Sequence, residues 1–237
     1  MASRVIAIDG PSASGKSSTA RAVAQALGFA HLDSGALYRG VTLVAQREAA
    51  RDPALAVESL DTIGAETVLR SAEDRGLRLH PDGTGFAIYL EGEPADDLIR
   101  SPEVTARVSA VSALPVVREW VNSYLRSMVR AGSDVVVDGR DIGTVVFPEA
   151  DLKVFLTASP ETRAGRRISQ RGHVQDPDRL REETAALAAR DHADSTRAVA
   201  PLRRAPDAID LDTTALTFEE QVERIVALAR ERFSDPR

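Results

Sequence analysis

The residues from Gly10 to Ser17 carry the clearest chemical signal in the sequence. They read GPSASGKS and fit the phosphate-loop pattern G-x-x-x-x-G-K-[ST] at every fixed position. Glycines let such a loop wrap a polyphosphate, with its N–H groups pointing inward and a helix N-terminus adding positive potential. Lys16 would reach the outer phosphates, and the Ser17 hydroxyl would complete the coordination shell of a Mg2+ ion. The pattern predicts a nucleoside-triphosphate site contacted by Gly10, Pro11, Ser12, Ala13, Ser14, Gly15, Lys16, Ser17 and Ser18.

A candidate acidic strand could supply a further metal ligand. The run Asp134-Val-Val-Val-Asp138 is β-branched and ends in a carboxylate. A strand of this form lies beside the phosphate loop in related folds, where its carboxylate holds Mg2+ through water. Asp33 also follows an apolar strand pattern, so the choice between Asp138 and Asp33 is open. We take Ser17 and Asp138 as the predicted metal ligands.

Four arginines could place positive charge over a transferred phosphoryl group. Arg163, Arg166, Arg167 and Arg171 are spaced i, i+3, i+4 and i+8, which puts them on one face of a helix. A glycine and a proline follow, so the segment resembles a mobile lid; a solvated basic face is the alternative. Phosphoryl transfer needs positioning and cations rather than covalent chemistry from the protein. One lysine, one Mg2+ and these arginines would supply them.

Alternating strands and helices must hold these residues in place. Strand patterns near residues 5, 30, 136, 154 and 209 are separated by helical patterns, which predicts a five-stranded parallel sheet covered on both faces. The predicted fold class is a three-layer α/β/α phosphate-loop fold, whose ligands bind at the carboxyl edge of the sheet. The helical patterns cover 18–27, 34–44, 53–69, 102–111, 115–130, 160–171, 177–193 and 218–229.

A different pattern interrupts this alternation between residues 62 and 100. Residues 77–91 alternate with period two around Pro81-Asp82-Gly83, which indicates an antiparallel hairpin, and residues 91–97 could add a third strand. We expect an inserted subdomain that closes over a second substrate; an edge sheet without a binding role is the alternative. The predicted layout is a single domain over 1–237, with its core at 1–61, 101–160 and 200–237, the insertion at about 62–100 and a lid at about 160–178.

Composition excludes several classes of protein. The chain has 237 residues and a net charge of -6, which disfavours duplex nucleic acid bound on a broad basic face. Cysteine is absent, so disulfides, thiolate metal sites and a cysteine nucleophile are excluded, and the four histidines lack the spacing of a zinc site. No apolar run approaches the ~20 residues that span a bilayer, and no signal peptide precedes the first strand. We therefore expect a cytoplasmic protein without a membrane partner, and a monomer, because nothing demands an interface.

The residue chemistry alone leads to a phosphate-loop kinase of a small acceptor. A nucleotide-dependent switch is a rival, but it should carry a guanine-reading Asn/Thr-Lys-x-Asp, and neither Lys16 nor Lys153 follows Asn or Thr. A kinase for another monophosphate or a cofactor precursor would share the fold and the loop. It would differ only in the residues that recognise the acceptor, so it remains an alternative at this level.

Four stretches in a fixed order extend the comparison beyond the phosphate loop. They are IDGPSASGKSS at 8–18, LDSGALYR at 32–39, VVDGRDIGTVVFPEAD at 136–151 and TRAVAPL at 196–202. Together they resemble the bacterial cytidylate kinases, which are phosphate-loop nucleoside monophosphate kinases. The resemblance implies Mg2+-dependent transfer of the γ-phosphoryl group of ATP to CMP or dCMP, giving ADP and CDP or dCDP. It also implies that the insertion is the region that binds the nucleoside monophosphate.

The same resemblance implies roles for individual residues. The acceptor's phosphate or sugar-phosphate edge would be held by Ser34, Arg39, Arg140 and Arg197, its ribose by Asp194, and its cytosine by Ser109, Arg118 and Asp141. A carboxylate can accept from the exocyclic amine of cytosine, and arginine can donate to the ring acceptors. The lid would carry Arg163, Arg167 and Arg171, and the expected catalytic cations are Lys16, Arg140, Arg163, Arg167 and Arg197.

Overall fold

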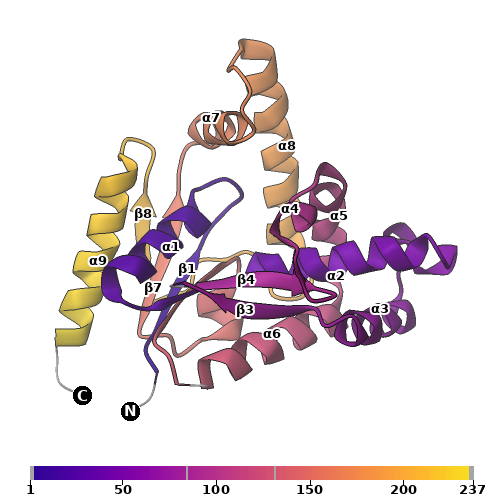
Figure 1. The fold of residues 1–237 in the computed structure, drawn as a ribbon. Coiled ribbons are helices and arrows are strands. Elements are labelled where there is room, and N and C mark those ends of the chain that lie inside the picture. The colour runs from indigo at the N-terminus through magenta and orange to yellow at the C-terminus, as the bar shows by residue number, and fades with distance from the viewer. Residues whose placement is uncertain (1–2, 84, 131, 235–237) are drawn as a thin grey trace. The chain divides into compact units, whose positions relative to one another are not determined.

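A computed structural model describes residues 3–83, 85–130 and 132–234 of the chain. The chain, drawn in Figure 1, divides into two compact units: the described residues within Met1–His31 and Ser133–Arg237 belong to unit 1, and those within Leu32–Gly132 belong to unit 2. Residues 1–2, 84, 131 and 235–237, which the predicted single domain includes, lie outside the described residues.

A parallel sheet forms the centre of unit 1. Its first strand, β1 (Val5–Asp9), is buried throughout and pairs in parallel with β6 (Val135–Gly139) on one side and β7 (Leu152–Thr157) on the other. β8 (Ile209–Asp212) pairs in parallel with β7, and β2 (Ala30–Asp33), which crosses the boundary between the units, follows β6 in the strand order β2-β6-β1-β7-β8. The five strands predicted from the sequence are thereby confirmed.

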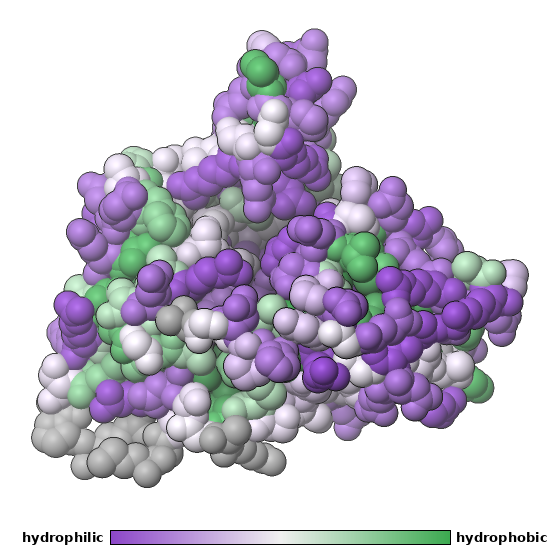
Figure 2. All heavy atoms as spheres, viewed as in Figure 1, coloured by the Kyte–Doolittle hydropathy of each residue, from purple (hydrophilic) through white to green (hydrophobic). Residues whose placement is uncertain are grey.

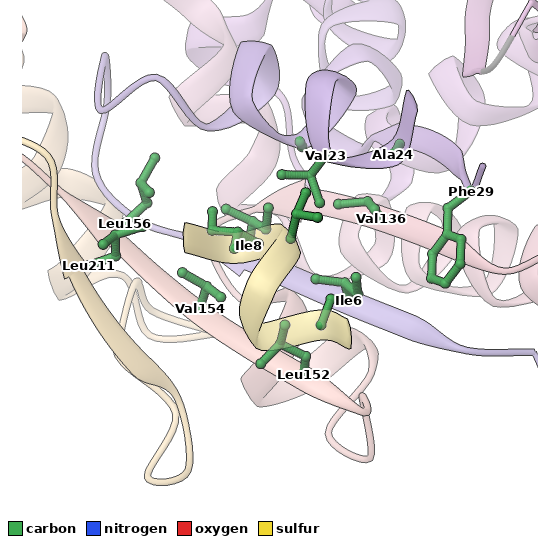
Figure 3. Close-up of a cluster of buried hydrophobic side chains, with 14 residues drawn as sticks. Ile6, Ile8, Val23, Ala24, Phe29, Val136, Leu152, Val154, Leu156 and Leu211 are labelled. Carbon is green, nitrogen blue, oxygen red and sulfur yellow. The ribbon is translucent and has the colours of Figure 1, made fainter. Parts of the chain in front are cut away.

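Two helices cover one face of this sheet with apolar side chains. α1 (Lys16–Leu27) and α9 (Phe218–Ser234) pack against each other and against β6 and β7. The end of α1 is set by Gly28, and α9 begins with a capping box in which Thr217 and Glu220 exchange hydrogen bonds. Figure 3 shows the resulting cluster, formed by Ile6, Ile8, Ala20, Val23, Ala24, Phe29, Val136, Leu152, Val154, Leu156, Leu211, Ile225, Val226 and Ala229.

A helical hairpin belongs to the same unit. α7 (Pro160–Gln170) is capped by the Ser159 hydroxyl and packs against the longer α8 (Pro177–Thr196). On the face that Figure 2 shows, most of the residues of this hairpin, at the top of the view, are hydrophilic. A single-turn π-helix, η3 (Ile142–Val146), follows β6.

Unit 2 combines helices with a small antiparallel sheet. The predicted hairpin is present as β3 (Arg78–Asp82) and β4 (Gly85–Leu90), and the third strand is reduced to β5 (Glu93–Pro94). These three strands bring the total among the described residues to eight, which are the five predicted for the parallel sheet and the three predicted for the insertion. The structure places all eight in one sheet, whereas the insertion was predicted to carry a small sheet of its own. The helices of this unit are α2 (Ser34–Ala49), α3 (Thr62–Asp74), α4 (Asp96–Ile99), α5 (Pro102–Ala113) and α6 (Pro115–Arg130).

The helix predicted from residue 53 to residue 69 is wrong. Asp52 and Pro53 start only a single 3-10 turn, η1 (Pro53–Leu55), because Ala56 adopts an extended conformation with ψ 138°. A second turn, η2 (Val57–Ser59), ends in the same way, and Asp61 then caps α3 through the Gly64 N–H. Two capping residues within one apolar pattern therefore divide it into three elements.

Within the described residues, no helix has the length and apolar character that crossing a membrane requires.

Candidate active site

The backbone of the phosphate loop depends on glycine at two positions. Gly10 has φ +154°, and a Cβ atom there would lie 2.1 Å from the Leu156 carbonyl oxygen, so a larger residue cannot occupy this site without displacing β7. Gly15 takes φ +92° at the N-cap of α1. The loop therefore leaves β1, passes close to β7 and delivers the chain into a 12-residue helix whose N-terminus favours anions.

Lys16 is folded into the loop that it would serve. Its Nζ atom donates to the Pro11 carbonyl oxygen at 2.6 Å and to the Ser14 hydroxyl at 3.3 Å. Burial, followed by the positive charge of Arg140, lowers the pKa of this ammonium well below its usual value. An anionic phosphate placed beside Lys16 would offset both effects, so the position is suited to a polyphosphate.

Ser17, which is partly buried, and the buried Asp138 form an oxygen pair beside the loop. The Ser17 hydroxyl donates to Asp138 Oδ2 at 2.6 Å, and His31 Nε2 lies 2.8 Å from Asp138 Oδ1. Burial raises the pKa of Asp138, but the hydrogen bonds from His31 and Ser17 and the charges of His31 and Lys16 outweigh it, so the pKa is lowered overall. Asp138 is therefore an anion at neutral pH, although it is only 3% exposed.

This oxygen pair suits Mg2+. A hydroxyl and a carboxylate oxygen are hard ligands, and Mg2+ commonly takes only one or two protein ligands alongside water and phosphate oxygens. The described residues contain no group of three or more His, Cys, Asp or Glu that could hold a metal. Asp33, the other carboxylate considered from the sequence, instead accepts from Ala36 N at the start of α2 and pairs with Arg100 at 3.3 Å.

A second buried carboxylate near the loop, Asp9, was not among the site residues predicted from the sequence. It is the last residue of β1, and Asp138 is the last but one of β6, so a carboxylate near the end of an apolar strand was the available signal. Its two oxygens accept from the Ile142 N–H at 2.8 Å and the Gly143 N–H at 2.7 Å. Burial raises the pKa of Asp9 to about 6, although these two hydrogen bonds lower it in part. Asp9 thereby fixes the start of η3, directly after the predicted substrate residues Arg140 and Asp141.

Two predicted arginines contact the phosphate loop from elsewhere in unit 1. Arg140 donates to the Gly10 carbonyl at 3.2 Å and to the Ser12 hydroxyl at 2.8 Å, while its Nε pairs with Asp194 at 2.9 Å. Arg163, in α7, donates to the Ser12 carbonyl at 2.9 Å. The structure thus brings Arg140, Arg163 and Asp194 together with the loop.

Asp191 links the loop to the helical hairpin and was also missed in the sequence. Its Oδ1 accepts from the Ser12 N–H at 2.8 Å, and its Oδ2 pairs with Arg163. Arg190, the preceding residue on α8, lies near the charges of Arg140 and Asp194; burial first, and then Arg140, lower its pKa to about 10. The position of Asp191 three residues before Asp194 was the only local hint, because the partners lie far away in sequence.

The four arginines that were predicted to share one helix face, three of them in α7 and Arg171 at its C-cap, contact different parts of the protein. Arg166 donates to the Ser14 carbonyl at 3.3 Å and to the Thr213 carbonyl at 2.8 Å, so it joins Arg163 near the loop. Arg167 donates to Gln170, and Arg171 pairs with Glu183 of α8 at 2.6 Å. Helical spacing placed the arginines correctly on the helix, but distant partners determine which of them face the phosphate loop.

Arg197 and Asp141 form another buried pair in unit 1. Arg197 Nη2 lies 3.4 Å from Asp141 Oδ1, and the two side chains are 7% and 5% exposed. The Nε atom of Arg197 also donates to the Ala200 carbonyl at 2.6 Å. Two predicted substrate-binding residues are therefore in contact with each other.

Unit 2 holds the remaining predicted residues. Ser34 is buried as the first residue of α2, and Arg39, one turn later, donates to the Ile99 carbonyl at 3.1 Å and to the Thr105 hydroxyl at 2.9 Å. Contacts within the same unit therefore fix the orientation of Arg39.

Arg118 and Ser109 are linked by hydrogen bonds to the same residue, Ser112. Arg118, which is 2% exposed, donates to the Ser112 carbonyl at 2.9 Å, and the Ser112 hydroxyl donates to the Ser109 carbonyl at 3.1 Å. The guanidinium of Arg118 also lies over the Tyr38 ring, 5.4 Å from its centroid. Tyr38 was not among the predicted residues, although it directly precedes Arg39.

Comparisons with known proteins agree with these features. The sequence model of the family described as "Cytidylate kinase" matches residues 6–231. A protein named cytidylate kinase from Mycobacterium avium (strain 104) is 45% identical over 229 residues, which are 96% of each chain. One of the same name from Geobacillus kaustophilus (strain HTA426) is 43% identical over 230 residues, again 96% of each.

A solved structure shares the fold at low sequence identity. An uncharacterized protein from Eubacterium ventriosum ATCC 27560 aligns over 95% of this chain and 97% of its own, with a TM-score of 0.50 and 10% identity. That likeness concerns the fold alone. The family match and the two bacterial relatives together span nearly the whole sequence, and they show that the chain belongs to the cytidylate kinase family.

Proposed function

We propose that the chain transfers the γ-phosphoryl group of ATP to CMP or dCMP, with Mg2+, giving ADP and CDP or dCDP. The observation that carries the proposal is the Ser17–Asp138 oxygen pair beside a glycine loop that Lys16, Arg140 and Arg163 contact directly. This is the set of groups that phosphoryl transfer requires, and family membership supports a cytidine monophosphate as the acceptor.

The donor is held by the phosphate loop and its cations. Lys16 exchanges its hydrogen bonds to the loop for bonds to the outer phosphates, and Arg163 and Arg167 add positive charge from α7. When bound, Mg2+ neutralises charge on the phosphate oxygens. Ser17 and Asp138 would hold that ion, and the burial of Asp138 limits competition from water for its carboxylate.

The acceptor is recognised by residues that already have partners inside the protein. Ser34, Arg39, Arg140 and Arg197 hold its phosphate or sugar-phosphate edge, Asp194 its ribose, and Ser109, Arg118 and Asp141 its base. Asp194 and Asp141 already face Arg140 and Arg197, at 2.9 Å and 3.4 Å. These pairs keep the charged groups ordered before substrate arrives, which reduces the entropy lost on binding.

The remaining parts of the layout follow from the same proposal. The core at 1–61, 101–160 and 200–237 carries the donor loop, residues 62–100 act as the nucleoside-monophosphate-binding insertion, and residues 160–178 act as the lid with Arg163, Arg167 and Arg171. The enzyme acts as a monomer on free cytoplasmic nucleotides.

A steady-state assay of ADP release tests the proposal. CMP, dCMP, UMP, AMP, GMP and a non-nucleotide acceptor are compared at saturating ATP and Mg2+. We expect the highest kcat/KM for CMP or dCMP. ADP release that no pyrimidine monophosphate stimulates would overturn the assignment, and a preference for a non-nucleotide acceptor would support the other small-acceptor kinase instead.

A further inference from the structure

His31 is a buried polar residue to which the proposed reaction gives no role. It lies on β2, is 2% exposed, and belongs to unit 1 together with Asp138. Its Nε2 atom is 2.8 Å from Asp138 Oδ1. An ionised carboxylate only accepts hydrogen bonds, so Nε2 carries the hydrogen and donates it.

The Asp138 carboxylate is therefore held at both ends. Oδ1 accepts from His31, and Oδ2 accepts from the Ser17 hydroxyl at 2.6 Å. The terminal torsion of aspartate is broad, so a carboxylate held at only one oxygen can turn about the bond that joins it to Cβ. A second fixed donor restricts this rotation and determines which oxygen faces Ser17.

The backbone fixes His31 in this position. The Ala30 N–H donates to the Asp134 carbonyl at 2.9 Å, which ties the start of β2 to the segment before β6. An apolar side chain would be buried here at a lower desolvation cost than an imidazole. The hydrogen bond to Asp138 explains why an imidazole is buried at this position.

We infer that His31 is a positioning residue that orients Asp138 towards Ser17 and so sets the affinity of the Ser17–Asp138 pair for Mg2+. The inference rests on the proposed function, because it assigns a metal to that pair. Residues that hydrogen-bond to metal ligands commonly change metal affinity by about 10- to 100-fold when they are replaced.

Two amide variants isolate the hydrogen bond from packing. His31→Gln places an N–H donor near the position of the imidazole Nε2, whereas His31→Asn is one methylene shorter and cannot reach Asp138 without moving β2. Both are polar and buried at the same site, so a simple loss of packing would affect them similarly. His31→Leu serves as the variant without any donor.

Binding of Mn2+ in the presence of ATP, followed by electron paramagnetic resonance of Mn2+, is the first measurement. We expect His31→Asn and His31→Leu to weaken Mn2+ binding by about 10-fold and His31→Gln to retain most of the affinity. In the ADP-release assay, the Mg2+ concentration for half-maximal rate should rise in parallel, with the KM for CMP unchanged within about 2-fold.

Equal Mn2+ affinity in all variants would overturn the inference, as would a loss in His31→Gln as large as that in His31→Asn. If His31→Leu does not fold, the difference in Mn2+ affinity between the glutamine and asparagine variants still tests the inference. Mn2+ binding is measured without an acceptor. A wild-type protein that binds Mn2+ and ATP but phosphorylates no pyrimidine monophosphate would therefore refute the proposed function and leave this test intact.

Discussion

The free energy of unfolding of an Asp9→Asn variant should rise relative to that of the wild type as the pH increases. Asp9 is 5% exposed, and its carboxylate accepts from the Ile142 and Gly143 N–H groups. Burial is the largest effect on this group and raises its pKa from 3.8 to about 6 in the folded protein. The substitution keeps the shape of the side chain and removes its titration.

The sign and size follow from linkage between proton binding and folding. Because the folded-state pKa of Asp9 is raised, the group stabilises the fold fully below the unfolded-state pKa, and this contribution is lost as the pH rises through about 6. A shift of about 2 pH units corresponds to about 3 kcal/mol over the whole range. Between about pH 5 and about pH 8, the part that is lost is about 1.4 kcal/mol.

Urea unfolding of the wild type and Asp9→Asn at these two pH values measures the effect. The free energy of unfolding of the wild type should fall relative to the variant by about 1.4 kcal/mol between the lower and the higher pH. The amide can accept only one of the two N–H groups well, which adds an offset that does not depend on pH. Asp82→Asn, at the exposed end of β3, is the matched control. A difference between wild type and Asp9→Asn that stays constant with pH, or changes in the opposite direction, would refute the reasoning.

Three further substitutions test the phosphate loop and the base-reading residues. Lys16→Ala should lower kcat by about 100- to 1,000-fold, as loss of a fixed donor does elsewhere, with little change in the thermal midpoint; near-normal ADP release would contradict its role. Asp141→Asn should reduce the ratio of kcat/KM for CMP over UMP, because an amide can also donate to uracil, and an unchanged ratio would remove Asp141 from the base readers. Gly10→Ala should lower the free energy of unfolding by about 2 kcal/mol, because its Cβ would lie 2.1 Å from the Leu156 carbonyl oxygen; a chemical denaturation curve that matches the wild type would contradict this.

Local patterns predicted the parts of the fold that local interactions determine. The phosphate loop, the β-branched strand that contains Asp138 and the β3–β4 hairpin each depend on residues close together in sequence. The helix predicted from residue 53 was divided because Ala56 is extended and Asp61 starts a new helix. An apolar pattern does not reveal such a break, since alanine fits a helix as well as it fits an extended linker.

The candidate site was harder to predict where contacts between residues far apart in sequence determine the partners of a side chain. Arg163 and Arg171 occupy the same predicted helix face, yet one contacts Ser12 and the other pairs with Glu183. The role of Asp191 depends on its hydrogen bond to Ser12, in a loop about 180 residues away in sequence. Spacing along a helix gives the direction in which a side chain points, but only the tertiary fold supplies its partner.

The contacts of Ser12 make one residue a junction between the loop and the helical hairpin. Its amide, carbonyl and hydroxyl are engaged by Asp191, Arg163 and Arg140, so each polar group of the residue is already in use. A phosphate that claims this amide competes with an anion supplied by the chain itself, and Asp191 must then give up its hold. Binding of a phosphate at this amide would therefore remove one of the contacts that join the loop to α8.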